Sequence, residues 1–204
     1  MRLIEIKEEL ITKGTLLGMP ALFFCFGGKD GGGMDMSVEE LLEIAQKSVM
    51  RYMVLTGELS HQLEELKILI EGLQENFRHI IVESDAQEFL DLDADLFSLD
   101  LNSRSFDRYG RSVWPKENID SYARSGKELE LRIFIEDEID LREVLIALSE
   151  HDIPRSKIFF VPTGGTFEEY LECLSFLSKE CLKYSFRLGA RLDHSLFKAK
   201  NMDC

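Results

Sequence analysis

Short apolar runs alternate along the chain with segments in which apolar residues recur at helical spacing. The runs predict strands at residues 21–26, 52–55, 79–82, 95–99, 129–135, 157–161 and 184–188. Strands that alternate with helices indicate a mostly parallel sheet with right-handed crossovers, and therefore an α/β fold. The pattern is compatible with a doubly wound sheet and with an open or a closed barrel.

The segments between the runs carry helix-start signals. Ser37 with Glu40 matches a capping box, and Asp140 with Glu143 and Thr166 with Glu169 mark two further helix starts. A weaker helix is predicted near residues 119–124. The predicted inward-facing residues are Val38, Leu41, Leu42, Ala45 and Val49; Leu63, Leu66, Leu69, Ile70 and Leu73; Leu141, Val144, Leu145 and Leu148; and Phe167, Tyr170, Leu171, Leu174, Leu177 and Cys181.

Composition narrows the class of protein. The chain has 204 residues, 45% of them apolar, which predicts a single folded domain over residues 1–204. Its net charge of −14 argues against nucleic acid or a membrane surface as the main partner. No apolar run approaches the length of a membrane span, and the start is charged too early for a signal peptide, so we expect a cytoplasmic protein. Four scattered cysteines predict no disulfide framework.

Ligands in α/β folds gather where strands end and helices begin. The loops at residues 27–37, 56–62, 83–88, 100–116, 136–140 and 162–166 are therefore the places to search for a site. The glycine-rich segment 27–33 is interpreted as a surface loop, since it lacks the Walker spacing. The acidic segments 91–95 and 136–138 are interpreted as solvated faces, and no metal site is predicted.

Read in order, several segments share a pattern with one enzyme family. They are ITKGTLLGMPALF (11–23), MSVEEL (36–41), VLTGE (54–58), VES (82–84), FFVPTGGT (159–166) and FRLGARLDH (186–194). Together they resemble 7-carboxy-7-deazaguanine synthase, a radical S-adenosylmethionine (SAM) enzyme of queuosine and deazapurine biosynthesis. The likeness runs from about residue 11 to residue 197. It implies an incomplete TIM-like β/α barrel and a homodimer.

The chain departs from that family where the family binds its iron–sulfur cluster. The family has a three-cysteine loop after the first strand, whereas residues 27–33 here contain no cysteine. A cluster needs several thiolates that converge on one small volume, so we expect no cluster and no radical chemistry. Cys25 stands where the family usually has an arginine that faces the substrate, and its reactivity is left open.

The other loops keep part of the family pattern. The SAM loop has Thr56, Gly57 and Glu58, one glycine short and without the proline, so SAM stays a candidate ligand only through its amino group. Glu83 and Ser84 stand where the family has Glu-Thr-Asn-Gly. The candidate catalytic residues are Glu58, Glu83 and His194. The candidate ligand-binding residues are Gly14, Thr15, Thr56, Gly57, Glu58, Glu83, Ser84, Arg187, Arg191 and His194.

Three functions follow from this combination. The leading hypothesis is a cluster-less relative that binds a SAM-, pterin- or deazapurine-like ligand, or a protein partner. The second is an enzyme with non-radical chemistry at the same barrel mouth. The third is a structural partner of an active paralogue, which predicts a filled barrel mouth and an apolar surface patch. A pocket lined by Gly57, Glu83 and Arg191 would favour the first two. Trp114 is interpreted as either a pocket lid or a dimer contact.

Overall fold

Seven parallel strands form the body of the protein. The computed structural model describes residues 1–28, 32–102 and 114–192. The sheet has nine strands in the order β3-β1-β2-β4-β5-β6-β7-β8-β9. The parallel strands are β2 (Pro20–Phe26), β4 (Tyr52–Gly57), β5 (His79–Ser84), β6 (Leu96–Asn102), β7 (Leu129–Ile135), β8 (Ile158–Pro162) and β9 (Arg187–Leu188).

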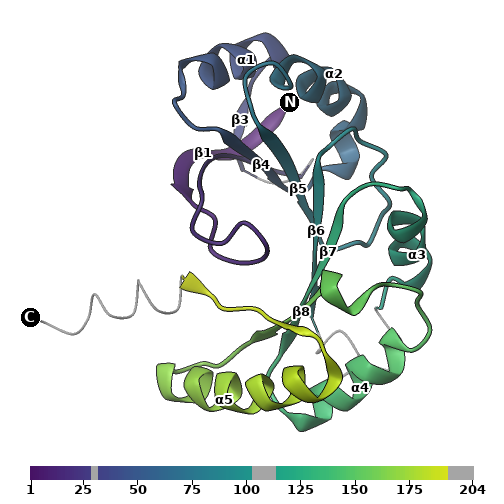
Figure 1. The fold of residues 1–204 in the computed structure, drawn as a ribbon. Helices are drawn as coiled ribbons and strands as arrows, with labels where there is room; N and C mark the ends of the chain where they lie inside the picture. Colours follow the sequence, from purple (N-terminus) through teal and green to yellow (C-terminus); the bar gives the residue numbers. More distant parts are fainter. Residues whose placement is uncertain (29–31, 103–113, 193–204) are drawn as a thin grey trace, which may run out of the picture.

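The sheet is curved but open. Among the described residues, β3 and β9 have a neighbour on one side only, so the strands do not close into a ring. The helices lie along the outer side of the curve, and the loop between β1 and β2 lies on its inner side (Figure 1). The expected α/β fold with an incomplete barrel is confirmed.

Two antiparallel strands at one edge were not predicted. β1 (Arg2–Leu10) pairs with β2 and with the short β3 (Met34–Asp35). Leu3 is the one fully buried residue of β1, and Lys7 bridges Glu5 and Glu9 on the same face of the strand. The sequence analysis missed β1 because an edge strand with so many charges lacks a continuous apolar signal.

Helices cover the outer face and bury one stripe each against it. They are α1 (Val38–Lys47), α2 (Leu63–Leu73), α3 (Lys116–Arg124), α4 (Glu138–Leu148) and α5 (Phe167–Tyr184), with 3-10 turns η1 (Ser60–Gln62) and η3 (Arg155–Lys157). The predicted capping box of Ser37 with Glu40 is present, and the helix start predicted at Thr166 with Glu169 also forms a capping box. None of the described helices is long and apolar enough to cross a membrane.

Some predicted helix positions are wrong. Val49 lies beyond the end of α1, since Ser48 is already extended, and its side chain is 83% exposed. Phe167 and Leu171 are exposed because the buried stripe of α5 runs through Tyr170, Cys173, Leu177 and Cys181.

Two element boundaries also differ from the prediction. α4 is capped by Asp137, whose carboxylate accepts hydrogen bonds from the backbone N–H groups of Ile139 and Asp140. Asp140 instead accepts one from the backbone N–H of Glu136, at 2.8 Å. The strand predicted at 184–188 begins only at Arg187, because α5 continues to Tyr184 and Ser185 ends it with a left-handed backbone.

The two faces of the sheet bury different side chains. The outer face contributes residues such as Phe24, Leu55, Leu99 and Leu131 to the main core under the helices. On the inner face, the amino-terminal halves of β2, β4, β5 and β6 carry a smaller apolar cluster, packed against the loop between β1 and β2. Its buried members are Ile11, Ala21, Tyr52, Val54, Ile81 and Leu96. Toward the carboxyl ends the inner face becomes polar, and the candidate site lies there.

The Ser37 cap provides a test of the local prediction. Ser37 Oγ accepts a hydrogen bond from the Glu40 backbone N–H at 3.2 Å, and the Glu40 carboxylate accepts one from the Ser37 N–H at 2.8 Å. We expect Ser37→Ala to lower the free energy of unfolding by about 1 kcal/mol, because helix N–H groups lose their acceptor. Ser178→Ala, an exposed position inside α5, is the matched control for urea unfolding. Equal effects of the two changes would contradict the capping role.

Candidate functional site

A buried arginine occupies the middle of the inner face. β7 has the sequence LELRIFI, in which Leu129, Leu131, Ile133 and Ile135 belong to the outer core, so Glu130 and Arg132 point inward. Arg132 is 1% exposed. A charge this deep is tolerated only when it is paired and hydrogen-bonded.

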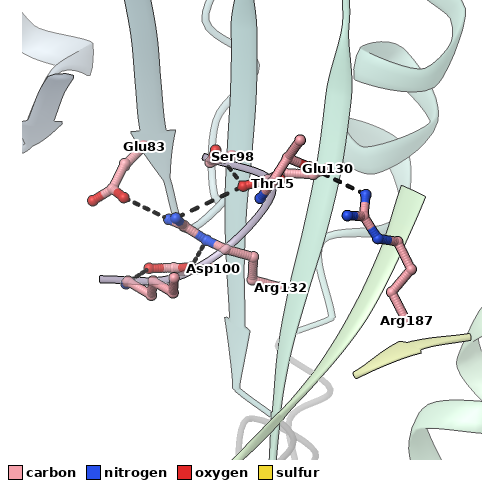
Figure 2. A network of polar contacts seen from close by, with 8 residues as sticks. Thr15, Glu83, Ser98, Asp100, Glu130, Arg132 and Arg187 are labelled. Carbon is pink, nitrogen blue, oxygen red and sulfur yellow. Dashed lines mark hydrogen bonds and ion pairs between the residues drawn. The ribbon is translucent and has the colours of Figure 1, made fainter. Parts of the chain in front are cut away.

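Three carboxylates from three strands surround Arg132 (Figure 2). Its Nη2 donates to Glu83 Oε1 of β5 at 2.8 Å, and its Nε donates to Asp100 Oδ1 of β6 at 2.6 Å. Glu130 Oε1 lies 3.8 Å from Nη1 and accepts a hydrogen bond from the Ser98 hydroxyl at 2.8 Å. The guanidinium therefore joins neighbouring strands on the inner face through side chains.

The loop between β1 and β2 completes this network. Lys13 Nζ forms a short ion pair with Asp100 Oδ2, and the Thr15 backbone N–H donates to Glu130 Oε2 at 2.8 Å. Gly14 has a φ of +82°, and a Cβ there would meet Glu130 Oε1 at 2.1 Å, so the loop needs a glycine to approach this closely. Of the predicted residues, Thr15 thus binds the Glu130 carboxylate in this structure, and Gly14 lies directly against it.

These contacts keep both the Glu83 carboxylate and the Arg132 guanidinium in their charged forms. Burial alone would raise the pKa of Glu83, but the Arg132 guanidinium and the Lys13 ammonium outweigh it and hold that pKa below its ordinary value. Burial likewise opposes the charge on Arg132, while Glu83, Asp100 and Glu130 raise its pKa, so the guanidinium stays charged. Thr56 adds a side-chain hydrogen bond to Glu83.

The free energy of unfolding should therefore depend on pH through the Glu83 carboxyl group. A carboxyl group with a lowered folded-state pKa stabilises the protein above its unfolded pKa, about 4.3, and this stabilisation is lost as the pH falls through the folded value. We expect Glu83→Gln to cost about 2–3 kcal/mol at pH 7, since a charged hydrogen bond is lost. The difference from the unchanged protein should shrink below about pH 4.3. Urea unfolding from pH 7 to pH 3 measures it.

Glu138→Gln is the control for that titration. Glu138 forms an exposed pair with Arg142 on α4 at 3.5 Å, and such pairs contribute less than about 1 kcal/mol. A Glu83→Gln effect that stays constant across the pH series would show that Glu83 is not the group that titrates.

An open cavity of about 430 Å³ lies beside the buried network, at the carboxyl ends of β4, β5 and β6. Its wall brings together five residues predicted from the sequence, Thr56, Gly57, Glu58, Glu83 and Ser84. The remaining lining residues are Leu59, Ser60, Asp85, Gln87, Glu88, Leu90 and Asp100. Five of the lining residues are acidic, and Arg132 and Lys13 pair with two of them, Glu83 and Asp100, from outside the cavity.

The backbone at Gly57 shapes the cavity entrance. Gly57 has a φ of +96°, and a Cβ there would lie 2.2 Å from the Phe26 carbonyl oxygen. The next residue, Glu58, donates its N–H to that same oxygen at 3.1 Å. Its carboxylate lies against Gly28, where a Cβ would come within 2.0 Å of Glu58 Oε2. Close packing of β2 and β4 thus places Glu58 at the cavity.

A second cavity of about 320 Å³ shares Asp85, Gln87 and Asp100 with the first and is also lined by Trp114. The Trp114 indole N–H donates to His151 Nε2 at 2.8 Å, and His151 Nδ1 lies 2.6 Å from Asp120 Oδ1. This chain of contacts holds Trp114 at the wall of the second cavity. Its interpretations as a pocket lid and as a dimer contact both stay predictions.

The structure separates the remaining candidates from the first cavity. Arg187 stacks on Phe159 at 4.0 Å and donates to Thr15 Oγ1 at 3.3 Å. Arg191 lies over the Phe134 ring at 5.7 Å. Neither arginine is among the residues that line the cavity of Gly57 and Glu83. His194 lies outside the described residues, and so does most of the segment that follows β6.

The described thiols do not fit an iron–sulfur cluster. Cys25 is half-buried on β2, whereas Cys173 and Cys181 are buried on α5, in the core of the outer face. Within residues 1–28, 32–102 and 114–192, no group of three His, Cys, Asp or Glu side chains is arranged to hold a metal ion. Burial raises the pKa of the Cys25 thiol, which disfavours the reactive thiolate.

Lys13, Ser98, Asp100, Glu130 and Arg132 were not among the site residues predicted from the sequence. A usable signal was present. In an apolar strand such as LELRIFI, two charges at alternate positions must share one face, and a buried charge needs a partner from a neighbouring strand. The identity of that partner depends on strand order, which the local pattern does not contain.

Fold and site together define the class of this protein. It is an α/β protein with an open β/α barrel and a polar cavity at the carboxyl ends of the strands. No model of a known protein family matches the chain, and no curated protein matches it.

A solved structure shares this architecture. The crystal structure of QueE from Escherichia coli matches with a TM-score of 0.70 over 93% of both chains, at 17% sequence identity. QueE is a 7-carboxy-7-deazaguanine synthase, the enzyme that the sequence motifs resemble. At this identity the match shows a shared fold, and the activity of QueE is not transferred to this chain.

Proposed function

We propose that this protein is a cluster-less relative of 7-carboxy-7-deazaguanine synthase that binds a small ligand without radical chemistry. The cavity at the ends of β4, β5 and β6 is the observation that carries the proposal. It is lined by Thr56, Gly57, Glu58, Glu83 and Ser84, and the resemblance independently assigned these residues to the ligand. A SAM-, pterin- or deazapurine-like compound is the expected class of ligand.

The chemistry of the cavity favours binding over catalysis. Glu83 forms an ion pair with Arg132, which holds its pKa low, so it is a poor proton donor and a weak base at neutral pH. Among the candidate catalytic residues that the structure describes, the acid–base enzyme considered as the second hypothesis would then depend on Glu58, without Arg187 or Arg191 at the same cavity. The open cavity also argues against the filled barrel mouth expected for a purely structural partner.

The proposal is tested by thermal denaturation of the purified protein with SAM and with pterin and deazaguanine compounds, alongside iron analysis. A ligand that binds only the folded state raises the melting temperature by mass action. We expect one compound to raise it in the absence of iron, and we expect Glu58→Gln to reduce the shift. Glu138→Gln, far from the cavity on α4, is the control. Stoichiometric iron and sulfide after anaerobic reconstitution would refute the cluster-less part of the proposal.

The expected homodimer and cytoplasmic location stay predictions. Light scattering of the purified protein measures the first. A monomer with an unoccupied cavity, and no shift with any compound, would move the interpretation to a protein partner.

A further inference from the structure

Two of the acidic side chains that line the cavity are paired with cations that do not line it. Glu83 and Asp100 both face the cavity, and Arg132 contacts one oxygen of each carboxylate. One guanidinium cannot neutralise two carboxylates. The second positive charge is the Lys13 ammonium, which binds Asp100 Oδ2.

Lys13 approaches Asp100 from the inner side of the sheet. It is absent from the lining of the two cavities described above, and its ammonium lies 5.3 Å from the centre of the Phe134 ring. The loop is fixed there by the Thr15–Glu130 hydrogen bond and by the close approach of Gly14 to Glu130. The position of the ammonium is therefore set by the fold and does not require a ligand.

We propose that Lys13 determines the charge preference of the cavity floor formed by Glu83 and Asp100, an inference that rests on the proposed ligand-binding function. Because Lys13 and Arg132 neutralise Asp100 and Glu83, the floor accepts uncharged N–H or O–H donors of a ligand. A cationic group there would have to compete with Lys13 for Asp100. Without Lys13, the floor carries an excess carboxylate and becomes a site for a primary ammonium.

A chemical rescue experiment tests this without knowledge of the natural ligand. The proteins are the unchanged chain, Lys13→Met, Lys13→Gln and Lys13→Arg, with Lys67→Met as the control. Lys67 pairs with Glu64 on the exposed face of α2, so its loss changes the net charge equally, away from the cavity. The probe is n-propylammonium chloride, compared with potassium chloride at equal ionic strength and with uncharged 1-propanol.

We expect propylammonium to raise the melting temperature of Lys13→Met and Lys13→Gln by about 2–4 °C relative to potassium chloride. The unchanged protein, Lys13→Arg and Lys67→Met should show no such gain, and 1-propanol should give none in any chain. An equal response of all variants, or no response of Lys13→Met and Lys13→Gln, would overturn the inference. If Lys13→Met and Lys13→Gln are unfolded in buffer alone, we expect propylammonium to restore their folding. Failure to restore it would also overturn the inference.

This outcome is separable from that of the proposed function. A selective propylammonium effect without any SAM, pterin or deazaguanine shift would reject the proposed ligands and retain the role of Lys13. The reverse result would retain ligand binding and reject Lys13 as the residue that sets the charge preference.

Discussion

Arg132→Met should destabilise the protein more than the other substitutions considered. We expect it to lower the free energy of unfolding by about 3–5 kcal/mol at pH 7. The side chain is 1% exposed and holds Glu83 at 2.8 Å and Asp100 at 2.6 Å. Methionine fills a similar volume, so the loss reports mainly on the carboxylates that remain buried without their partner. Chemical denaturation with urea measures it.

Two further variants separate charge from geometry in this prediction. Arg142→Met removes an exposed arginine on α4, side chain 75% exposed, and should cost less than about 1 kcal/mol. Arg132→Lys keeps the charge but cannot reproduce the planar set of donors, so an intermediate loss is expected. If Arg132→Met and Arg142→Met cost the same, the buried network does not hold the strands together as described.

Gly57→Ala should produce the second largest loss, about 2–5 kcal/mol. Two effects combine there. An alanine at a φ of +96° is strained by about 1–2 kcal/mol, and its Cβ would lie 2.2 Å from the Phe26 carbonyl oxygen, so β2 and β4 must move apart. The same movement would displace Glu58, whose N–H binds that carbonyl.

Gly126→Ala is the matched control for that change. Gly126 also has a positive φ, +75°, but no atom lies within 4 Å of the position its Cβ would take. It should therefore show the backbone cost alone, about 1–2 kcal/mol. Equal losses for the two alanines would mean that the approach of β4 to β2 is less tight than the structure indicates.

The sequence was most informative where the signal is local. The capping box at Ser37 and the helix start at Thr166 are present as predicted, because each depends on residues three positions apart. The grouping of Thr56, Gly57, Glu58, Glu83 and Ser84 follows from their place at the ends of two successive strands, since the carboxyl ends of neighbouring parallel strands meet at one edge.

Prediction from the sequence was least successful for contacts that depend on how far apart two strands lie in the sheet. Arg187 was grouped with Glu83 because both lie at strand ends, yet β9 and β5 are separated by β6, β7 and β8. The curvature that would bring them together is a property of the whole sheet. The pairing of Arg132 with Glu83 is hidden for the same reason, since it depends on which strands are neighbours and in which register.

The loop between β1 and β2 has a consequence for biosynthesis. Its partners lie far along the chain: Lys13 binds Asp100, 87 residues away, and Thr15 binds Glu130, 115 residues away, and Arg187, 172 residues away. During translation this segment leaves the ribosome well before its partners, and Arg187 is the last of these partners to be made. Contacts of such long range are slow to form, because the chain entropy must be lost before they contribute. The loop should therefore form its contacts with the barrel strands late in folding, after β5, β6 and β7 have paired.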